Sequence, residues 1–136
     1  MKSKCACGDV ELNIGKSEHT TINCHCNMCR KLHGSPFTTW VSFPKSSVIE
    51  EPSLFGKTTQ YHVGENSISL FCKKCGTHVM AKDARYPEVV AFLAGTLEGI
   101  DINTVSGEYF YSDKVHWLGN LDSIKKFGGK SGFEQL

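Results

Sequence analysis

The sequence predicts a mainly β fold with antiparallel strands and only short helical turns. Thirteen glycines divide the 136 residues into short segments, most of them rich in the β-branched and aromatic residues that favour strands. Apolar and polar residues alternate strictly over residues 10–14, which is typical of a strand with one buried face. Segments 58–63 and 67–72 are separated by three residues that include Gly64, a spacing that predicts a β-hairpin.

Further strands are expected at 20–23, 37–43, 77–82, 89–94 and 108–111. The nearly continuous apolar run at 89–94 predicts a central strand buried on both faces. A short helix is expected at 27–33, ended by Gly34-Ser35-Pro36. A second is expected at 122–127, with Asp122 capping its start and Gly128 its end.

Length and composition predict one domain, residues 1–136, of a soluble globular class. Hydrophobic residues make up 40% and charged residues 21%, close to the globular average. No apolar run approaches the roughly 18 residues of a membrane span, and the N-terminus lacks the hydrophobic segment of a secretory signal. We therefore expect a cytoplasmic protein without a membrane partner. The net charge of +1 carries no clustered basic excess, so we expect no nucleic-acid partner.

Seven cysteines at close spacing indicate metal ligands rather than disulfides. An odd number cannot pair completely, and a reducing cytoplasm disfavours bridges. Zinc in a structural role takes four protein ligands, whereas catalytic zinc keeps three and leaves one position for water or substrate. The count predicts two zinc ions per chain, the structural one at Cys5, Cys7, Cys72 and Cys75 and the catalytic one at Cys24, Cys26 and Cys29.

The four-cysteine set has two competing interpretations. A redox dithiol shares the spacing of Cys72-x-x-Cys75, but such a motif normally starts a helix in a βαβ pattern, which this sequence lacks. Four thiolates could also hold iron as in rubredoxins, which use two matched C-x-x-C motifs. Because Cys5-x-Cys7 has only one intervening residue, zinc is favoured.

The three-cysteine set leaves one coordination position open or gives it to His33, four residues after Cys29. His25 lies between two ligands and is expected to point away from the ion. Three thiolates on one zinc leave a negative charge, which Arg30 and Lys31 are close enough to offset while meeting an anionic ligand. Trp40 belongs to the strand that leaves this turn and is expected to form a wall of the site.

These motifs resemble the glutathione-dependent formaldehyde-activating enzymes, a family that includes relatives of centromere protein V. The resemblance rests on Cys5-x-Cys7-Gly8, Cys24-His25-Cys26-x-x-Cys29-Arg30-Lys31-x-x-Gly34-Ser35-Pro36-Phe37-x-x-Trp40, Phe71-Cys72-x-x-Cys75-Gly76-Thr77 and Ala94-Gly95-Thr96-Leu97. The chain departs from the pattern ahead of Trp117, where members usually carry a histidine and this sequence has Gly107-Glu108-Tyr109-Phe110.

The resemblance implies an antiparallel fold of the β-tent type, stapled by the structural zinc. It also implies a carbon–sulfur lyase that joins formaldehyde to glutathione, giving S-hydroxymethylglutathione, and reverses that reaction. The expected substrate contacts are Arg30, Lys31, Gly34 and Trp40. A non-catalytic zinc module that carries glutathione or docks a partner is the alternative function.

Overall fold

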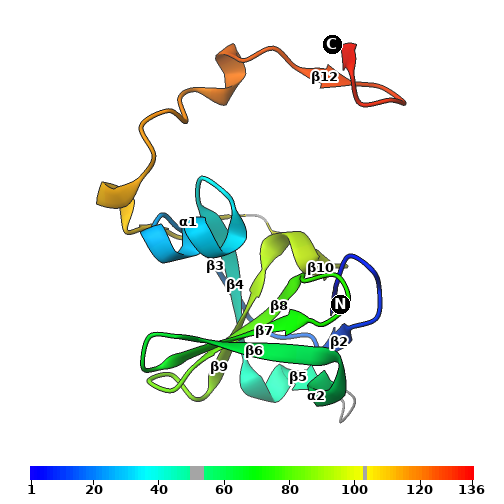
Figure 1. Ribbon diagram of the computed structural model, residues 1–136, viewed down its shortest axis with the longest axis vertical. Coiled ribbons are helices and arrows are strands. Elements are labelled where there is room, and N and C mark those ends of the chain that lie inside the picture. Colours follow the sequence, from blue (N-terminus) through cyan, green and yellow to red (C-terminus); the bar gives the residue numbers. More distant parts are fainter. Residues whose placement is uncertain (50–53, 103) are drawn as a thin grey trace.

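A computed structural model shows a mainly β fold built on two sheets (Figure 1) and describes residues 1–49, 54–102 and 104–136. The larger sheet has seven strands, in the spatial order β11 (Glu108–Tyr109), β3 (Thr20–Cys24), β4 (Thr38–Pro44), β9 (Val89–Leu93), β8 (His78–Asp83), β7 (Ser67–Cys72) and β6 (Thr58–Val63). The smaller has four, in the order β10 (Leu97–Glu98), β1 (Lys2–Lys4), β2 (Glu11–Ile14) and β5 (Val48–Ile49). All pairings in both sheets are antiparallel except β11 with β3, which is parallel.

Short helices fill the connections between the strands. In the described ranges two are α-helical, α1 (Asn27–His33) and α2 (Leu54–Lys57), and four are 3-10 turns, η1 (Lys45–Ser47), η2 (Ala94–Thr96), η3 (Tyr111–Asp113) and η4 (Leu121–Ser123). Among the described residues, no helix is long and apolar enough to cross a membrane. The helix expected at 27–33 is confirmed, and so are the strands expected between residues 10 and 94, whose ends differ by at most one residue. The strand expected at 108–111 is confirmed only over Glu108–Tyr109, because Phe110 turns the chain into η3.

The core is formed by one face of the large sheet and residues of the small sheet. Leu12 of β2, Val41 and Phe43 of β4, Met80 of β8 and Phe92 of β9 are each at most 1% exposed and belong to one buried cluster. Alternation along β2 and β4 explains this burial, because successive side chains of a strand point to opposite faces. The two sheets therefore bury one face each.

The outer face of the large sheet is only partly covered. In β9, Val90 and Phe92 are buried, while Val89 is exposed and Ala91 is half-buried. The prediction of a central strand was correct, since β9 lies between β4 and β8, but its burial on both faces was wrong. Ala91 pairs with Ser42 and with Ala81, so three small residues form one row across this face. The apolar residues along β9 did not reveal that its second face is partly exposed.

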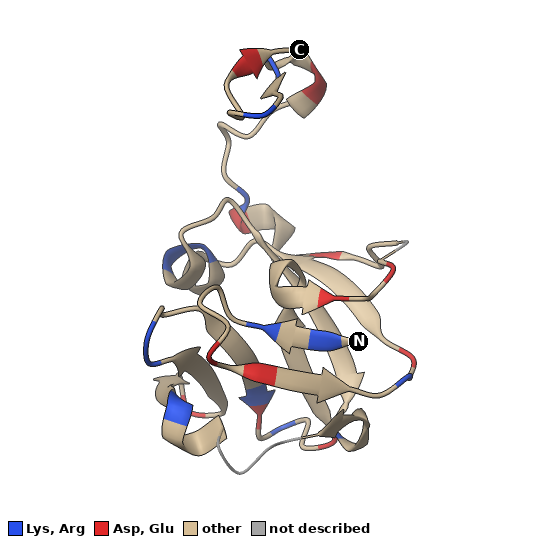
Figure 2. Cartoon of the chain, turned by 90° about the vertical axis from the view of Figure 1, so that its right-hand side faces the viewer, with Lys and Arg blue, Asp and Glu red and all other residues tan. Residues whose placement is uncertain are grey.

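The C-terminal segment after residue 113 extends away from the two sheets (Figures 1 and 2). The helix expected at 122–127 was wrong: η4 spans Leu121–Ser123, Asn120 caps it, and β12 (Phe127–Gly128) pairs with β13 (Glu134–Gln135). A helix of one or two turns gains most of its stability from packing an apolar face, and Ile124 and Phe127 are more than half exposed here. The assignment of residues 1–136 to one domain stays a prediction.

Candidate metal centres and the pocket beside them

The four predicted structural ligands come together from distant parts of the chain. The sulfur atoms of Cys5, Cys7, Cys72 and Cys75 all lie within 4.8 Å of one another. Two matched turns deliver them: Gly8 and Gly76 both have positive φ, of 81° and 74°, and each donates its amide to the carbonyl of a cysteine. The amide of Ala6 donates to the Thr77 hydroxyl oxygen at 3.1 Å and so joins the two turns.

Polar neighbours stabilise negative charge on two sulfurs of this cluster, those of Cys5 and Cys75. The Val10 amide donates to Cys5 Sγ at 3.2 Å, and the Thr77 hydroxyl lies 3.1 Å from Cys75 Sγ. Hydrogen bonding from Thr77 lowers the pKa of Cys75 to about 5. Thiolates are the ligand form that zinc requires. The donor set therefore suits a metal ion with four sulfur ligands.

The second cluster is built within one turn of chain. Cys24 ends β3, Cys26 caps α1, and Cys29 lies in the first turn of that helix. Their three sulfurs also lie within 4.8 Å of one another. Cys26 Sγ accepts a hydrogen bond from the Cys29 amide at 3.3 Å. Gly34 ends the helix in the left-handed conformation with φ of 60°, which returns the chain into β4.

Burial acts against thiolate formation in the three-cysteine cluster. It raises the pKa of Cys24, which is 7% exposed, and that of Cys29. A hydrogen bond from the Trp40 side chain to Cys29 acts in the opposite direction. The pKa of Cys26 is instead lowered, with hydrogen bonding from the Cys29 amide opposing the effect of burial. Gathered thiols are stabilised as thiolates when a cation binds between them. This cluster also fits a metal ion, with three sulfur ligands.

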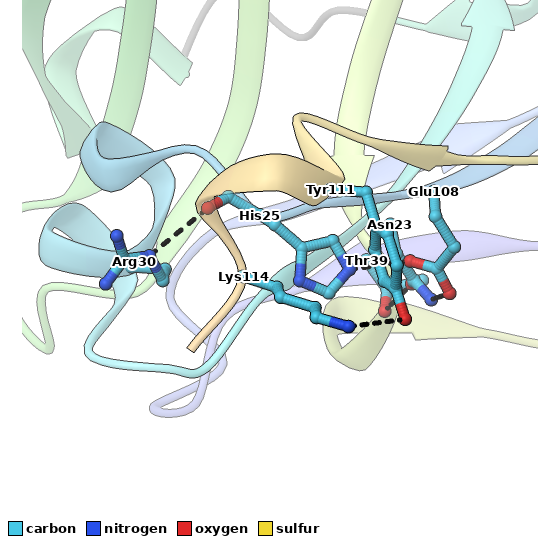
Figure 3. Close-up of polar contacts among 7 residues, drawn as sticks. All are labelled: Asn23, His25, Arg30, Thr39, Glu108, Tyr111 and Lys114. Carbon is cyan, nitrogen blue, oxygen red and sulfur yellow. Dashed lines mark hydrogen bonds and ion pairs between the residues drawn. The ribbon is translucent and has the colours of Figure 1, made fainter. Parts of the chain in front are cut away.

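His25 is fixed by a hydrogen-bonded network that involves the distant strand β11 (Figure 3). Its Nε2 lies 2.7 Å from Glu108 Oε2. Glu108 Oε1 accepts a hydrogen bond from Asn23 Nδ2 at 3.0 Å, and Asn23 Oδ1 accepts one from the Thr39 hydroxyl at 2.7 Å. The Asn23 hydrogen bond and the His25 contact hold the pKa of Glu108 below its usual value. A carboxylate therefore orients the histidine that separates two of the clustered cysteines.

A pocket of about 440 Å³ opens beside the three-cysteine cluster on the outer face of the large sheet. Cys24 of the cluster lines this pocket, and so does Trp40, which acts on the pKa of Cys29. Tyr109 and Phe110 line it from β11 and the following residue. The predicted wall position of Trp40 therefore coincides with a real concavity.

Comparison with known proteins places the chain in a family. The family described as "Glutathione-dependent formaldehyde-activating enzyme" matches residues 1–113. This chain belongs to the glutathione-dependent formaldehyde-activating family. A relative from Schizosaccharomyces pombe, named an uncharacterized lyase, is 27% identical over 113 residues, which are 83% of this chain and 80% of that protein. A crystal structure of a Rhodobacter sphaeroides protein has the same fold, with a TM-score of 0.60 and 22% identity over 79% of this chain and 99% of that one.

Family membership makes the placement of the expected substrate contacts informative. Arg30 and Lys31 lie in the last turn of α1, where cations also stabilise the helix terminus. Arg30 Nε donates to the His25 carbonyl oxygen at 3.2 Å (Figure 3). Neither Arg30 nor Lys31 lines the pocket. Gly34 is an exposed helix cap. Of the four residues expected at the substrate, only Trp40 lies on the pocket wall, and the substrate role of all four stays a prediction.

His33 does not join the three-cysteine cluster as a ligand. Its ring packs edge-on against Trp40 and against His78, with ring centroids 5.5 Å and 4.9 Å apart. Burial lowers the pKa of both histidines, that of His78 to about 4. In the described part of this family member, the cluster gathers no histidine, aspartate or glutamate beside its three cysteines. The interpretation with an open fourth position is the one that this geometry favours.

Sequence reasoning did not find two residues of the site. Glu108 was noted only because it departs from the family pattern, yet it pairs with His25. Phe110 was expected only as part of a strand at 108–111, but it is 64% exposed and lines the pocket. The missed signal was the position of Glu108 directly before two aromatic residues, which contact the site only because β11 pairs with β3.

Proposed function

We propose that this chain is a zinc-dependent carbon–sulfur lyase that joins a small aldehyde to glutathione, with formaldehyde as the aldehyde that the family name indicates. The observation that carries the proposal is the three-cysteine cluster beside a pocket, because in the described residues it gathers no fourth amino-acid ligand. Membership of the family and the lyase name of the S. pombe relative support the same reaction class.

Cys24, Cys26 and Cys29 would hold the catalytic zinc, and Cys5, Cys7, Cys72 and Cys75 the structural one. A zinc ion with three protein ligands supplies an open position that makes a bound thiol a thiolate, or a bound carbonyl oxygen more electrophilic. The structural set differs in having four sulfurs contributed by segments more than 60 positions apart, as the 3.8 Å contact between Cys7 and Cys72 shows.

The chain's own residues would orient the reactants around this position. The Trp40 side chain lowers the pKa of Cys29 and lines the pocket, so it would favour the thiolate of a ligand and cover the reacting atoms from one side. Glu108 fixes His25 between Cys24 and Cys26. Arg30 and Lys31 offer two positive charges on α1, which suit the carboxylates of glutathione.

The reaction is an addition in which no oxidant is needed. The thiol sulfur forms a bond to the carbonyl carbon, the carbon–oxygen double bond becomes single, and the thiol proton ends on the new hydroxyl oxygen. Reversal returns thiol and aldehyde. This chemistry requires a site that stabilises a thiolate near an accessible carbonyl, and the three-cysteine cluster beside an open pocket meets both needs.

Exchange spectroscopy tests the proposal, because formaldehyde and glutathione also combine unaided in water. NMR measures the rate of exchange between formaldehyde and its glutathione adduct with and without zinc-loaded protein. We expect a rate increase that is lost in Cys26→Ser. An unchanged rate together with glutathione binding would instead indicate the carrier function.

A further inference from the structure

The pocket beside the three-cysteine cluster owes its depth to small side chains in one row. Ser42 of β4 pairs with Ala91 of β9, and Ala91 pairs with Ala81 of β8. Side chains of directly paired residues lie on the same face of a sheet. All three line the pocket, which therefore has a floor made of small residues across three adjacent strands.

On this face of the large sheet, the pocket extends to the three-cysteine cluster. Ile22 and Cys24 are two residues apart on β3 and so point to one side, and both line the pocket. Trp40 pairs with Ile22 and also lines the pocket, and its side chain acts on the pKa of Cys29. A molecule that reacts at the three-cysteine cluster therefore has its nearest space for a substituent in this pocket.

Two exposed aromatic residues, Tyr109 and Phe110, form a further part of the pocket wall. Tyr109 pairs with Cys24, and Phe110 follows it with φ of 53°, the only non-glycine residue in the described ranges with positive φ. A bulky residue in the left-handed region is rare, and such residues gather at active sites and ligand clamps. Their side chains are 53% and 64% exposed. These rings are placed to cover a ligand rather than to fill the core.

The lining does not match a highly charged ligand. Among the described residues that line the pocket, Lys82 is the only lysine or arginine. Asp83 lies at the same end, and its carboxylate already accepts hydrogen bonds from Arg85 at 2.6 Å and from Ser67 at 3.1 Å. Glutathione carries two carboxylates and an ammonium group, so its charged groups suit the cations of α1, Arg30 and Lys31, better than this pocket.

We propose that the pocket binds an apolar ring or chain attached to the carbonyl carbon of the aldehyde substrate. The volume of about 440 Å³ far exceeds the single carbon of formaldehyde, and a cavity of about 150 Å³ already binds benzene. The inference rests on the proposed function, keeps its reaction, and replaces formaldehyde as the preferred aldehyde by one with an apolar substituent. The addition itself is unchanged: sulfur bonds to the carbonyl carbon, and the thiol proton ends on the hydroxyl oxygen.

Aldehyde selectivity tests the inference. The kcat/KM of zinc-loaded protein is measured with glutathione and either cyclohexanecarbaldehyde or formaldehyde. We expect cyclohexanecarbaldehyde to be favoured by about ten-fold or more, since even one methylene in an apolar pocket is worth about ten-fold. Ala91→Leu fills the floor and should lower that ratio at least five-fold. Thr59→Leu, which adds the same apolar bulk on the exposed edge strand β6, should leave the ratio as it is.

The outcomes separate the inference from the proposed function. No rate gain with either aldehyde overturns the proposed function and the aldehyde assignment together. A rate gain with formaldehyde that equals or exceeds the gain with cyclohexanecarbaldehyde overturns only the inference. So does an equal selectivity ratio in Ala91→Leu and Thr59→Leu.

A binding measurement without catalysis completes the test. Trp117 lies in the C-terminal segment and is 63% exposed. In the variant Trp117→Phe, Trp40 is the remaining tryptophan. Its fluorescence is titrated with the unreactive alcohol cyclohexylmethanol, with methanol as the matched control. We expect a saturable change with cyclohexylmethanol that weakens at least five-fold in Ala91→Leu. The same weak response to both alcohols contradicts the assignment.

Discussion

Replacing Cys72 with serine should destabilise the fold far more than replacing Cys29. Cys72 ends β7, is 2% exposed, and belongs to a cluster that ties residues 5–7 to residues 72–75. The metal in such sites supplies folding free energy, about 10–16 kcal/mol in zinc-finger peptides. A domain of this size is stable by only about 5–15 kcal/mol in total. Losing one thiolate from a closed set should therefore remove a large part of the stability.

Cys29 lies in a different situation. It is half-buried, and its partners Cys24 and Cys26 lie within the same turn. Its loss releases no distant segment, so we expect about 1–2 kcal/mol, the range of most single substitutions. In melting temperature this is roughly 3–8 °C, whereas Cys72→Ser should lose about 15 °C or more or fail to fold.

Metal analysis beside calorimetry measures both effects. The unchanged protein should hold about two zinc ions per chain by the ligand rule. Cys29→Ser should retain the structural zinc, keep its fold, and lose glutathione-dependent activity. If Cys29→Ser melts as low as Cys72→Ser, both zinc sites are structural, and the reasoning on an open catalytic position is refuted.

Three further predictions concern single side chains. Arg30→Ala should weaken binding of glutathione at least five-fold more than binding of mercaptoethanol, measured by calorimetry, because only glutathione offers carboxylates to the guanidinium; equal losses would make Arg30 structural. Glu108→Gln should lower kcat about ten-fold, as does loss of a group that orients a metal-site residue. Its melting temperature should stay within about 3 °C of that of the unchanged protein. An unchanged kcat would show that the orientation of His25 by Glu108 does not contribute to catalysis. His78, with a pKa lowered to about 4 by burial, is neutral in the fold but takes up a proton near pH 6.5 when unfolded. Stability should therefore fall as pH drops from about 6.5 towards 4, by up to about 3 kcal/mol. His78→Phe should flatten this slope in denaturant titrations with zinc content monitored, and a slope equal to that of the unchanged protein would contradict the assignment.

Local patterns were sufficient for most of the strands and for both cysteine clusters. The hairpin β6–β7 was predictable because its register follows from a three-residue loop between two apolar segments. The helix α1 was predictable from its end at Gly34, which adopts the left-handed conformation that glycine favours. The four-cysteine set followed from ligand number alone, although its segments are far apart in sequence.

Long-range pairing and surface packing were beyond local patterns. The contact of Glu108 with His25 depends on the parallel pairing of β11 with β3, across 83 positions of sequence. Nothing in the local sequence fixes that register, because β11 has only two residues. The predicted C-terminal helix was wrong because helix propensity over six residues is insufficient when Ile124 and Phe127 stay more than half exposed against the described part of the chain. The apolar run of β9 could not distinguish a buried second face from one that lines a pocket.

The occupant of the fourth position at the three-cysteine cluster tests the central claim most directly. Cobalt(II) replaces zinc in both sites, and its absorption reports the number of thiolates bound to each ion. Adding glutathione to the cobalt-loaded protein should strengthen the thiolate-to-cobalt absorption in a saturable way, and Cys26→Ser should abolish that change. A spectrum that glutathione leaves unaltered, in protein that holds two cobalt ions per chain, would contradict an open thiol-binding site at Cys24, Cys26 and Cys29.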